Sequence, residues 1–221
     1  MIVQVYGVTT PEDAAAVSAL RPDHVGVVLD EGVETWDSVD RATARAIGLE
    51  LGGDVKLVAL SLSTDPSRVR RTVDDLEPDI VHLARVSGGI GAAGVAALRD
   101  ELGGVEVMST VPVRGPDALE VAAELAECSD YLLLDTAHPE SGVVGATGYV
   151  HDWSVSARIV QALDVPVVLA GGLGPDNVRE AIRVVRPWGV DSETRTSRAD
   201  DRRRKDVDAV RRFVEIARLA G

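Results

Sequence analysis

Short apolar runs alternate with longer amphipathic stretches along the whole chain. The runs are mostly Val, Leu and Ile, and apolar residues follow one another rather than alternating strictly with polar ones. This pattern is typical of strands that are buried on both faces, as in a parallel sheet. It predicts strands at 2–6, 24–29, 56–61, 79–84, 105–109, 130–135, 166–171 and 188–191.

Helical patterns fill the intervals between these strands, at 11–20, 37–51, 66–76, 91–102, 116–127, 154–163, 176–185 and 206–219. Several open with a proline behind a capping residue, a common helix start. Thr10-Pro11 and Asp65-Pro66 have this form, and Gly115-Pro116 and Gly174-Pro175 resemble it.

Strict alternation of eight strands with eight helices restricts the architecture. The connection rules leave an open doubly wound sheet or a closed (β/α)8 barrel. Eight regular units in 221 residues fit the barrel better. We therefore predict an α/β fold with one (β/α)8 TIM-barrel domain over residues 1–221.

The charge balance excludes several classes of partner. The formal net charge is −13, so no basic surface is expected for nucleic acid or for an anionic membrane. Only Lys56 and Lys205 are lysines, and the other basic residues are arginines. Abundant acids with so few lysines indicate a salt-adapted source, although a high-GC genome also favours arginine over lysine.

Cysteine content and hydropathy indicate in which cellular compartment the protein is found. Cys128 is the only cysteine, so the chain forms no internal disulfide, and we interpret it as a small buried filler. No apolar run approaches the ~18 residues that span a bilayer, and no signal peptide is recognisable. We expect a cytoplasmic protein that needs no cofactor and no metal.

In such barrels the active site lies at the carboxyl ends of the strands. The stretch AGGLGPDNV (170–178) follows the seventh predicted strand, and its pair Gly171-Gly172 lets backbone N–H groups approach an anion closely. The GATG segment, which ends at Gly148, adds further N–H donors. We predict phosphate binding here, with a simple tight turn as the alternative.

Two titratable side chains are candidates for chemistry. Asp135 ends the apolar run LLLD, where poor solvation raises a carboxyl pKa and suits a general acid. His82 alternates out of DIVHLA into the barrel, as a ligand contact or as a satisfied core histidine. A metal site from Asp30, His82, Asp135 and His138 is a weaker alternative, because no compact metal motif is present.

The segment after the last predicted strand is charged. Asp191, Ser192, Glu193 and Thr194 stand at the carboxyl end of that strand and are candidate substrate or phosphate ligands. The following run, Arg202 to Lys205, alternates with aspartates, and we interpret it as a solvated face.

Several of these motifs together resemble a known family. YLLLDT, GATGYVHDW, VPVVLAGGLGPDNV and GVD follow the order of LLLD, GGTG, DW, AGGL-P-NV and GVD in phosphoribosylanthranilate isomerases. The opening VQVYGVTTPEDA resembles the family's KICGIT strand and turn. The likeness runs the length of the chain, strongest over 131–191.

The resemblance implies a (β/α)8 barrel that performs a metal-free Amadori rearrangement of a phosphoribosylated aromatic amine. It assigns the general acid to Asp135 and phosphate-binding loops to Gly148, Gly171 and Gly172. The family's base is a cysteine at the end of the first strand, where this chain has Tyr6. The segments corresponding to SPR, QLHG and VSSGVE also differ.

We therefore expect an aldose–ketose isomerase of this type that acts on a phosphorylated sugar and has diverged in substrate. Asp135 and Tyr6 are the candidate catalytic residues, and Tyr6, Glu193 or Asp30 would move the second proton. The alternatives are a non-catalytic barrel that binds a phosphorylated ligand, and a metal-assisted epimerase or aldolase. The expected assembly is a monomer or homodimer.

Overall fold

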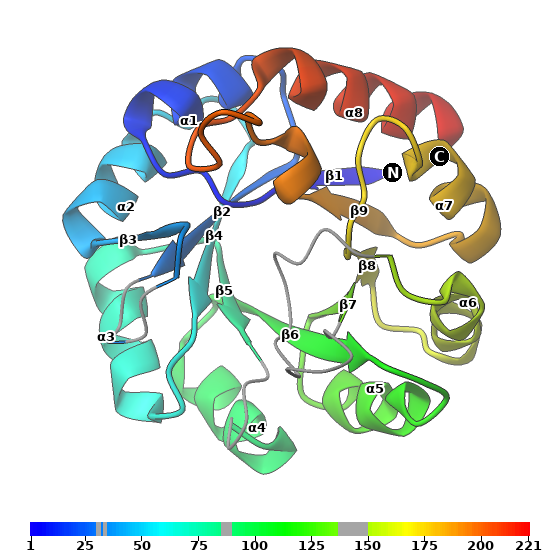
Figure 1. The fold of residues 1–221 in the computed structure, drawn as a ribbon. Helices are drawn as coiled ribbons and strands as arrows, with labels where there is room; N and C mark the ends of the chain where they lie inside the picture. Colours follow the sequence, from blue (N-terminus) through cyan, green and yellow to red (C-terminus); the bar gives the residue numbers. More distant parts are fainter. Residues whose placement is uncertain (30–31, 33–34, 85–89, 137–149) are drawn as a thin grey trace.

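Parallel strands close into a barrel that helices surround (Figure 1). This computed structural model describes residues 1–29, 32, 35–84, 90–136 and 150–221. Within them the strands are β1 (Ile2–Val5), β2 (His24–Leu29), β3 (Ser38–Val39), β4 (Lys56–Ser61), β5 (Ile80–Leu83), β6 (Glu106–Val113), β7 (Tyr131–Thr136), β8 (Val167–Leu169) and β9 (Gly189–Ser192). The helices are α1 (Pro11–Ser18), α2 (Arg41–Leu49), α3 (Pro66–Leu76), α4 (Ala92–Glu101), α5 (Ala118–Ala126), α6 (Trp153–Ala162), α7 (Val178–Val185), α8 (Val207–Ala220) and the short 3-10 helix η1 (Thr194–Thr196).

The order of strands is β1-β9-β8-β7-β6-β5-β4-β2, and β1 pairs with β2 to close the ring. All pairings are parallel, and the two-residue β3 adds to β2 at the rim. The predicted TIM barrel is therefore confirmed. All carboxyl ends meet at one face, where the candidate side chains were expected.

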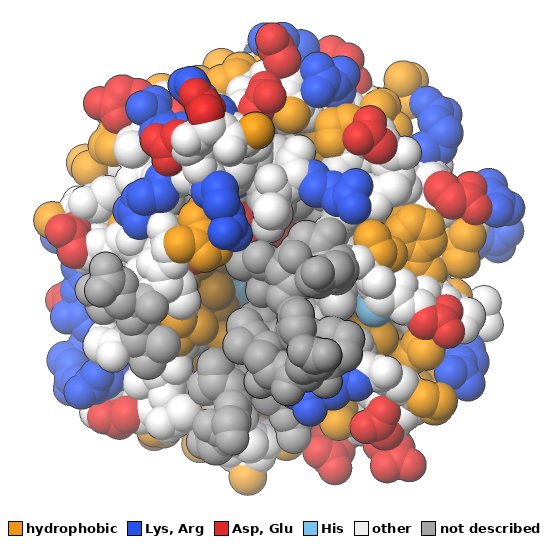
Figure 2. Space-filling view, in the orientation of Figure 1, with side chains coloured by type: hydrophobic (Ala, Val, Ile, Leu, Met, Phe, Trp, Pro, Cys, Tyr) orange, Lys and Arg blue, Asp and Glu red, His pale blue; other side chains and the backbone are white. Residues whose placement is uncertain are grey.

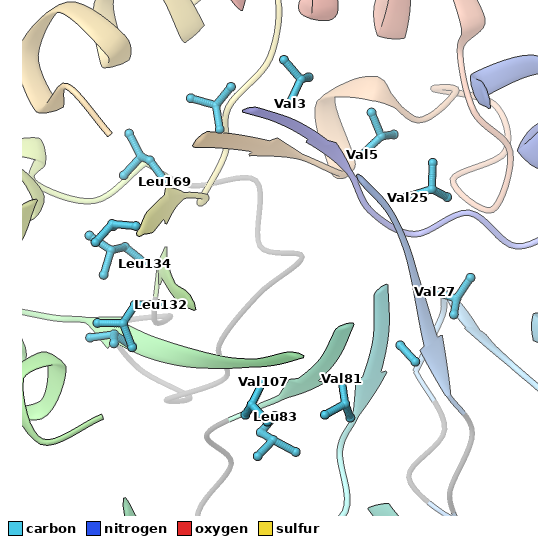
Figure 3. Packing of buried hydrophobic residues seen from close by; sticks show 14 of the residues in the cluster. Val3, Val5, Val25, Val27, Val81, Leu83, Val107, Leu132, Leu134 and Leu169 are labelled. Carbon is cyan, nitrogen blue, oxygen red and sulfur yellow. The ribbon is translucent and has the colours of Figure 1, made fainter. Parts of the chain in front are cut away.

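Apolar residues pack on both sides of the barrel wall. Outward-facing side chains such as Val5, Val27, Val81 and Leu169 pack toward the helices (Figure 3). A second cluster fills the interior and consists of Tyr6, Val28, Val58, Ile80, Met108, Tyr131, Leu133, Val168 and Ala170. Burial on both faces explains why the strand sequences are continuous apolar runs.

Aspartates just before three strands tie neighbouring strands together at the amino-terminal face. Each carboxylate accepts a hydrogen bond from a backbone N–H at the start of the adjacent strand, always at 2.8 Å: Asp23 from Val3, Asp79 from Leu57 and Asp130 from Val107. These bonds fix the register at the end of the barrel opposite the site.

Helix starts agree with the capping signals only in part. Thr10 and Asp65 cap α1 and α3 as predicted. The helix expected from residue 37 begins at Arg41, because Asp40 accepts the N–H of Thr43 and caps it there. The Gly174-Pro175 signal is followed by a turn before α7 starts.

The run from Arg202 to Lys205 is only partly a solvated face: Arg202 and Arg203 are exposed, but the interpretation is wrong for Arg204 and Lys205. Arg204 forms two hydrogen bonds, at 2.9 and 3.0 Å, with the buried carboxylate of Asp13. Arg203 donates to the backbone oxygen of Trp36, and only 3% of Lys205 is exposed. The segment is a strap that joins β9 to α1 and to the chain after β2.

Two smaller points complete the fold. Cys128 is buried, as predicted, and its thiol lies 3.4 Å from the backbone oxygen of Leu125. No helix in the described part of the chain has the length and apolarity to cross a membrane.

Candidate active site

Tyr6 follows β1 and points into the barrel. Its hydroxyl lies 2.8 Å from Nδ1 of His82, and the other imidazole nitrogen lies 2.7 Å from the hydroxyl of Thr110. The ring has room only because β2 carries a glycine, since a Cβ on Gly26 would lie 2.6 Å from it. The chain of Tyr6, His82 and Thr110 thus spans β1, β5 and β6.

This chain of hydrogen bonds is uncharged. Burial lowers the pKa of His82 to about 3, so the imidazole is neutral. Burial raises the pKa of Tyr6 well above its ordinary value, and the negative charges of Asp191, Glu193 and Asp37 raise it further. A neutral phenol that donates to Nδ1 of His82, with Nε2–H donating to Thr110, satisfies all three groups.

Asp135 lies near the carboxyl end of β7. Its Oδ1 accepts a hydrogen bond of 2.7 Å from the N–H of Thr136. Burial nevertheless raises the pKa of Asp135 to about 6. A carboxyl that titrates near neutrality can donate a proton under physiological conditions.

Asp191 shares a level of the barrel with Asp135. The pairings Leu134↔Leu169 and Leu169↔Val190, continued by one residue, put Ala170 between the two aspartates. Burial, and then the charge of Asp135, raise the pKa of Asp191 to about 8. Two carboxyl groups with separated pKa values therefore face the same interior space.

Glu193 extends one step beyond β9 and forms a second acidic group with Asp37. Burial, the hydrogen bond with Asp37 and the charge of Asp37 raise the pKa of Glu193 well above its ordinary value. The buried ammonium of Lys205 lies 3.2 Å from the backbone oxygen of Glu193 and 3.0 Å from the hydroxyl of Ser197. Burial lowers the pKa of Lys205, and the charges of Glu193 and its neighbours oppose that shift.

The loop after β8 has the backbone shape that its glycines allow. Gly171 and Gly172 adopt φ values of +82° and +62°. Asn177 holds the loop by accepting the N–H of Gly174 at 2.9 Å and donating to the oxygen of Gly172 at 3.0 Å. Asn177 therefore stabilises the loop instead of capping α7.

Close neighbours make Gly171 irreplaceable in this conformation. A Cβ there would lie 2.2 Å from the hydroxyl of Thr136. Thr136 is itself 3.0 Å from Nδ1 of His151, whose other nitrogen is 2.7 Å from Ser156. The loop thus rests on a fixed hydrogen-bonded support that connects β7 to α6.

The loop after β9 touches the glycine loop. Ser192 donates to the backbone oxygen of Leu173 at 2.7 Å, and a Cβ on Gly174 would lie 2.6 Å from Cβ of Arg195. Among the described residues, nothing accepts a hydrogen bond from the N–H groups of Gly172, Leu173, Thr194 or Arg195. Figure 2 shows basic side chains on the side of the mouth where this segment runs.

Most of the candidates from the sequence lie at this one face. Hydrogen bonds or effects on each other's pKa link Tyr6, His82, Asp191 and Glu193. The charge of Asp135 raises the pKa of Asp191. Gly148 and the metal candidates Asp30 and His138 lie outside the described residues. Within the described ranges, no group of three or more His, Cys, Asp or Glu side chains is placed to hold a metal ion.

Sequence reasoning missed two members of the site. Asp37 stood in a predicted helix and had no motif to distinguish it. Lys205 belongs to the run interpreted as solvated, although it is one of only two lysines in an arginine-rich chain. Both contact Glu193 only because the barrel brings distant segments together.

Comparison with known proteins agrees with this geometry. The sequence model of the family described as N-(5'phosphoribosyl)anthranilate (PRA) isomerase matches residues 3–215. The N-(5'-phosphoribosyl)anthranilate isomerase of Haloferax volcanii is 37% identical over 99% of this chain and 93% of its own length. That of Haloarcula marismortui is 36% identical over 99% and 96%. These haloarchaeal relatives support the salt-adapted interpretation of the composition.

Solved structures give the same result. The phosphoribosyl anthranilate isomerase of Thermotoga maritima has a TM-score of 0.81 and 27% identity, covering 99% of this chain and 100% of that one. A phosphoribosyl anthranilate isomerase in complex with reduced 1-(o-carboxyphenylamino)-1-deoxyribulose 5-phosphate also has a TM-score of 0.81, at 25% identity over 99% and 100%. The chain therefore belongs to the N-(5'-phosphoribosyl)anthranilate isomerase family, whose members are aldose–ketose isomerases.

Proposed function

We propose that this protein isomerises an N-(5'-phosphoribosyl)amine from the aldose to the ketose form, with Asp135 as general acid and without a metal. The observation that carries the proposal is the Asp135 carboxyl, whose pKa burial raises to about 6, at the same end of the barrel as loop N–H groups that have no acceptor among the described residues. Family membership supplies the reaction type.

The phosphate is proposed to bind at the two touching loops after β8 and β9. The N–H groups of Gly172, Leu173, Thr194 and Arg195 offer a concentrated set of donors for its oxygens. Ser192 fixes the two loops relative to each other through its bond to Leu173. Binding at this rim leaves the ribose extending toward the centre of the barrel.

Asp135 is proposed to start the reaction by protonating the ring oxygen. The C1–O bond then breaks, and the lone pair of the amine nitrogen forms a C1=N bond. Loss of the C2 proton moves electrons back to nitrogen and gives an enol-amine. Protonation at C1 and loss of the C2 hydroxyl proton complete the ketose. The step needs no oxidant or reductant.

The amine side of the substrate is proposed to differ from anthranilate. At the position of the family's base, Tyr6 fills the interior and is bonded to His82. A phenol with a raised pKa does not act like a thiolate, whose reference pKa is ~8.5. Asp37 and Glu193 add acidic groups at the same rim, which disfavours an amine that carries its own carboxylate.

The test is ketose formation from PRA and from phosphoribosylamines with uncharged amine substituents, using wild type and Asp135→Asn. We expect turnover by wild type and a loss of about 10²-fold or more in kcat for Asp135→Asn. The variant should retain the thermal stabilisation produced by reduced 1-(o-carboxyphenylamino)-1-deoxyribulose 5-phosphate, because the phosphate donors are unchanged. Equal turnover by the two proteins would refute the assignment of the acid.

A non-catalytic role remains the second candidate, because Tyr6 occupies the position of the family's base. In that case the same ligands would raise the Tm of wild type while no ketose formed. A cytoplasmic location and a monomeric or homodimeric state stay predictions from the sequence.

A further inference from the structure

We propose that Glu193 is the general base that removes the C2 proton in place of the missing thiol. This inference rests on the proposed function, which assigns no residue as the general base, and it names that residue. It depends on the position of the Glu193 carboxyl, on its unpaired oxygen and on the charges around it.

The carboxyl of Glu193 lies beside the end of β1. Strands β1 and β9 pair through Val5 and Ser192, and the N–H of Tyr6 donates to the oxygen of Ser192 at 3.0 Å. A Cβ on Gly7 would lie 2.6 Å from Oε1 of Glu193. Since the Tyr6 phenol turns inward to His82, the rim next to β1 is left to the Glu193 carboxyl.

One oxygen of this carboxyl receives no hydrogen bond from a donor. Oε1 of Glu193 is buried and has no hydrogen-bond partner among the described residues. A buried polar atom without a partner is costly, and such atoms are concentrated where a ligand completes them. Its neighbour Asp37 is also buried, whereas the rest of the Glu193 side chain is half-buried.

The Glu193 carboxyl lies between an acid and a cation. Burial and the neighbouring Asp37 raise the pKa of Glu193, which makes its carboxylate a stronger base, and the charge of Lys205 opposes that shift. Oε1 of Glu193 accepts the C2 proton. The C2–H electron pair forms the C1=C2 bond, and the proton subsequently returns to C1.

Other groups at the mouth fit this role less well. The Tyr6 phenol is held neutral and donates to His82. Asp191 is in register with Gln4, below the level of Tyr6, and shares that level with Asp135. Glu193 is the carboxyl at the rim of β1, opposite the acid on β7.

The test uses Glu193→Gln, which preserves side-chain size and leaves the backbone oxygen that binds Lys205. With the phosphoribosylamine that wild type turns over best, we expect kcat to fall about 10²-fold or more, with KM changed less than about threefold. Glu193→Asp should recover part of the rate. With substrate deuterated at C2, the slowed variant should express a larger primary isotope effect than wild type.

Glu106→Gln is the matched control, because Glu106 bonds Tyr131 at the amino-terminal end of the barrel and should leave kcat unaltered. The inference would be overturned if Glu193→Gln turned over substrate at the wild-type rate. It would also be overturned if Tyr6→Phe lost turnover while Glu193→Gln was unaffected. Either result would leave the proposed function standing. Absence of turnover by wild type with every phosphoribosylamine would instead reject the proposed function, and this inference with it.

Discussion

At the scale of single residues, burial determines the chemistry of the site. The sequence predicts a raised pKa for Asp135, because this carboxyl ends an apolar strand and is poorly solvated, and it predicts that His82 points into the barrel. Asp37 could not be predicted, since its partner Glu193 is distant in the chain. The behaviour of Tyr6 likewise depends on Gly26 and His82, which no local pattern connects to it.

The raised pKa of Asp191 predicts how stability depends on pH. Its folded-state pKa of about 8 lies above the ordinary 3.8, so between these values the folded state retains a proton that the unfolded chain has lost. Stability therefore falls as pH rises through this window, by about 1.4 kcal/mol per unit for a fully expressed shift.

Asp191→Asn removes this contribution. Urea unfolding should show the variant gaining stability relative to wild type between pH 5 and pH 8, by ~2 kcal/mol or more. A difference between the two proteins that stays constant over this range would contradict the buried, protonated state of Asp191.

At the scale of elements, local signals predicted the strands and helices but not all of the connections. The caps at Thr10 and Asp65 use bonds within a few residues, so the sequence contains them. The strap after β9 depends on Asp13, which lies 191 residues from Arg204. Contacts of that separation have no local pattern, and the solvated interpretation of Arg204 and Lys205 failed for this reason.

The glycine loop offers a test at this scale. Gly171→Ala puts a Cβ 2.2 Å from the hydroxyl of Thr136 in a left-handed backbone, whereas Gly53→Ala has the same backbone problem with no atom within 4 Å. We expect Gly53→Ala to cost about 1 kcal/mol and Gly171→Ala clearly more, with weaker binding of the phosphorylated product analogue. Equal stability and equal binding in the two variants would contradict the support that we describe for this loop.

For the molecule as a whole, the fold was predictable from the sequence, and the net charge affects stability. Eight buried strands alternating with helices allow few architectures, so the barrel followed from pattern alone. The net charge of −13 comes from 36 acidic and 23 basic residues. Repulsion among surface acids destabilises the compact state when little salt is present.

Salt should therefore stabilise the protein. Between about 0.01 M and 1 M, the Debye length falls from ~30 Å to ~3 Å, which screens this repulsion. We expect Tm to rise by several degrees, measured by circular dichroism in sodium chloride. Since osmolytes also stabilise proteins, sucrose at matched osmolality is the control and should have a smaller effect. A Tm that is flat or falls with salt would contradict the salt-adapted interpretation.

The decisive measurement is ketose formation from phosphoribosylamines, PRA included, by wild type and Asp135→Asn in parallel. We expect enzyme-dependent formation of the ketose by wild type and a loss of about 10²-fold or more in the variant, with ligand binding retained. Turnover that is unchanged in Asp135→Asn, or no ketose from any phosphoribosylamine with wild type, would contradict this expectation.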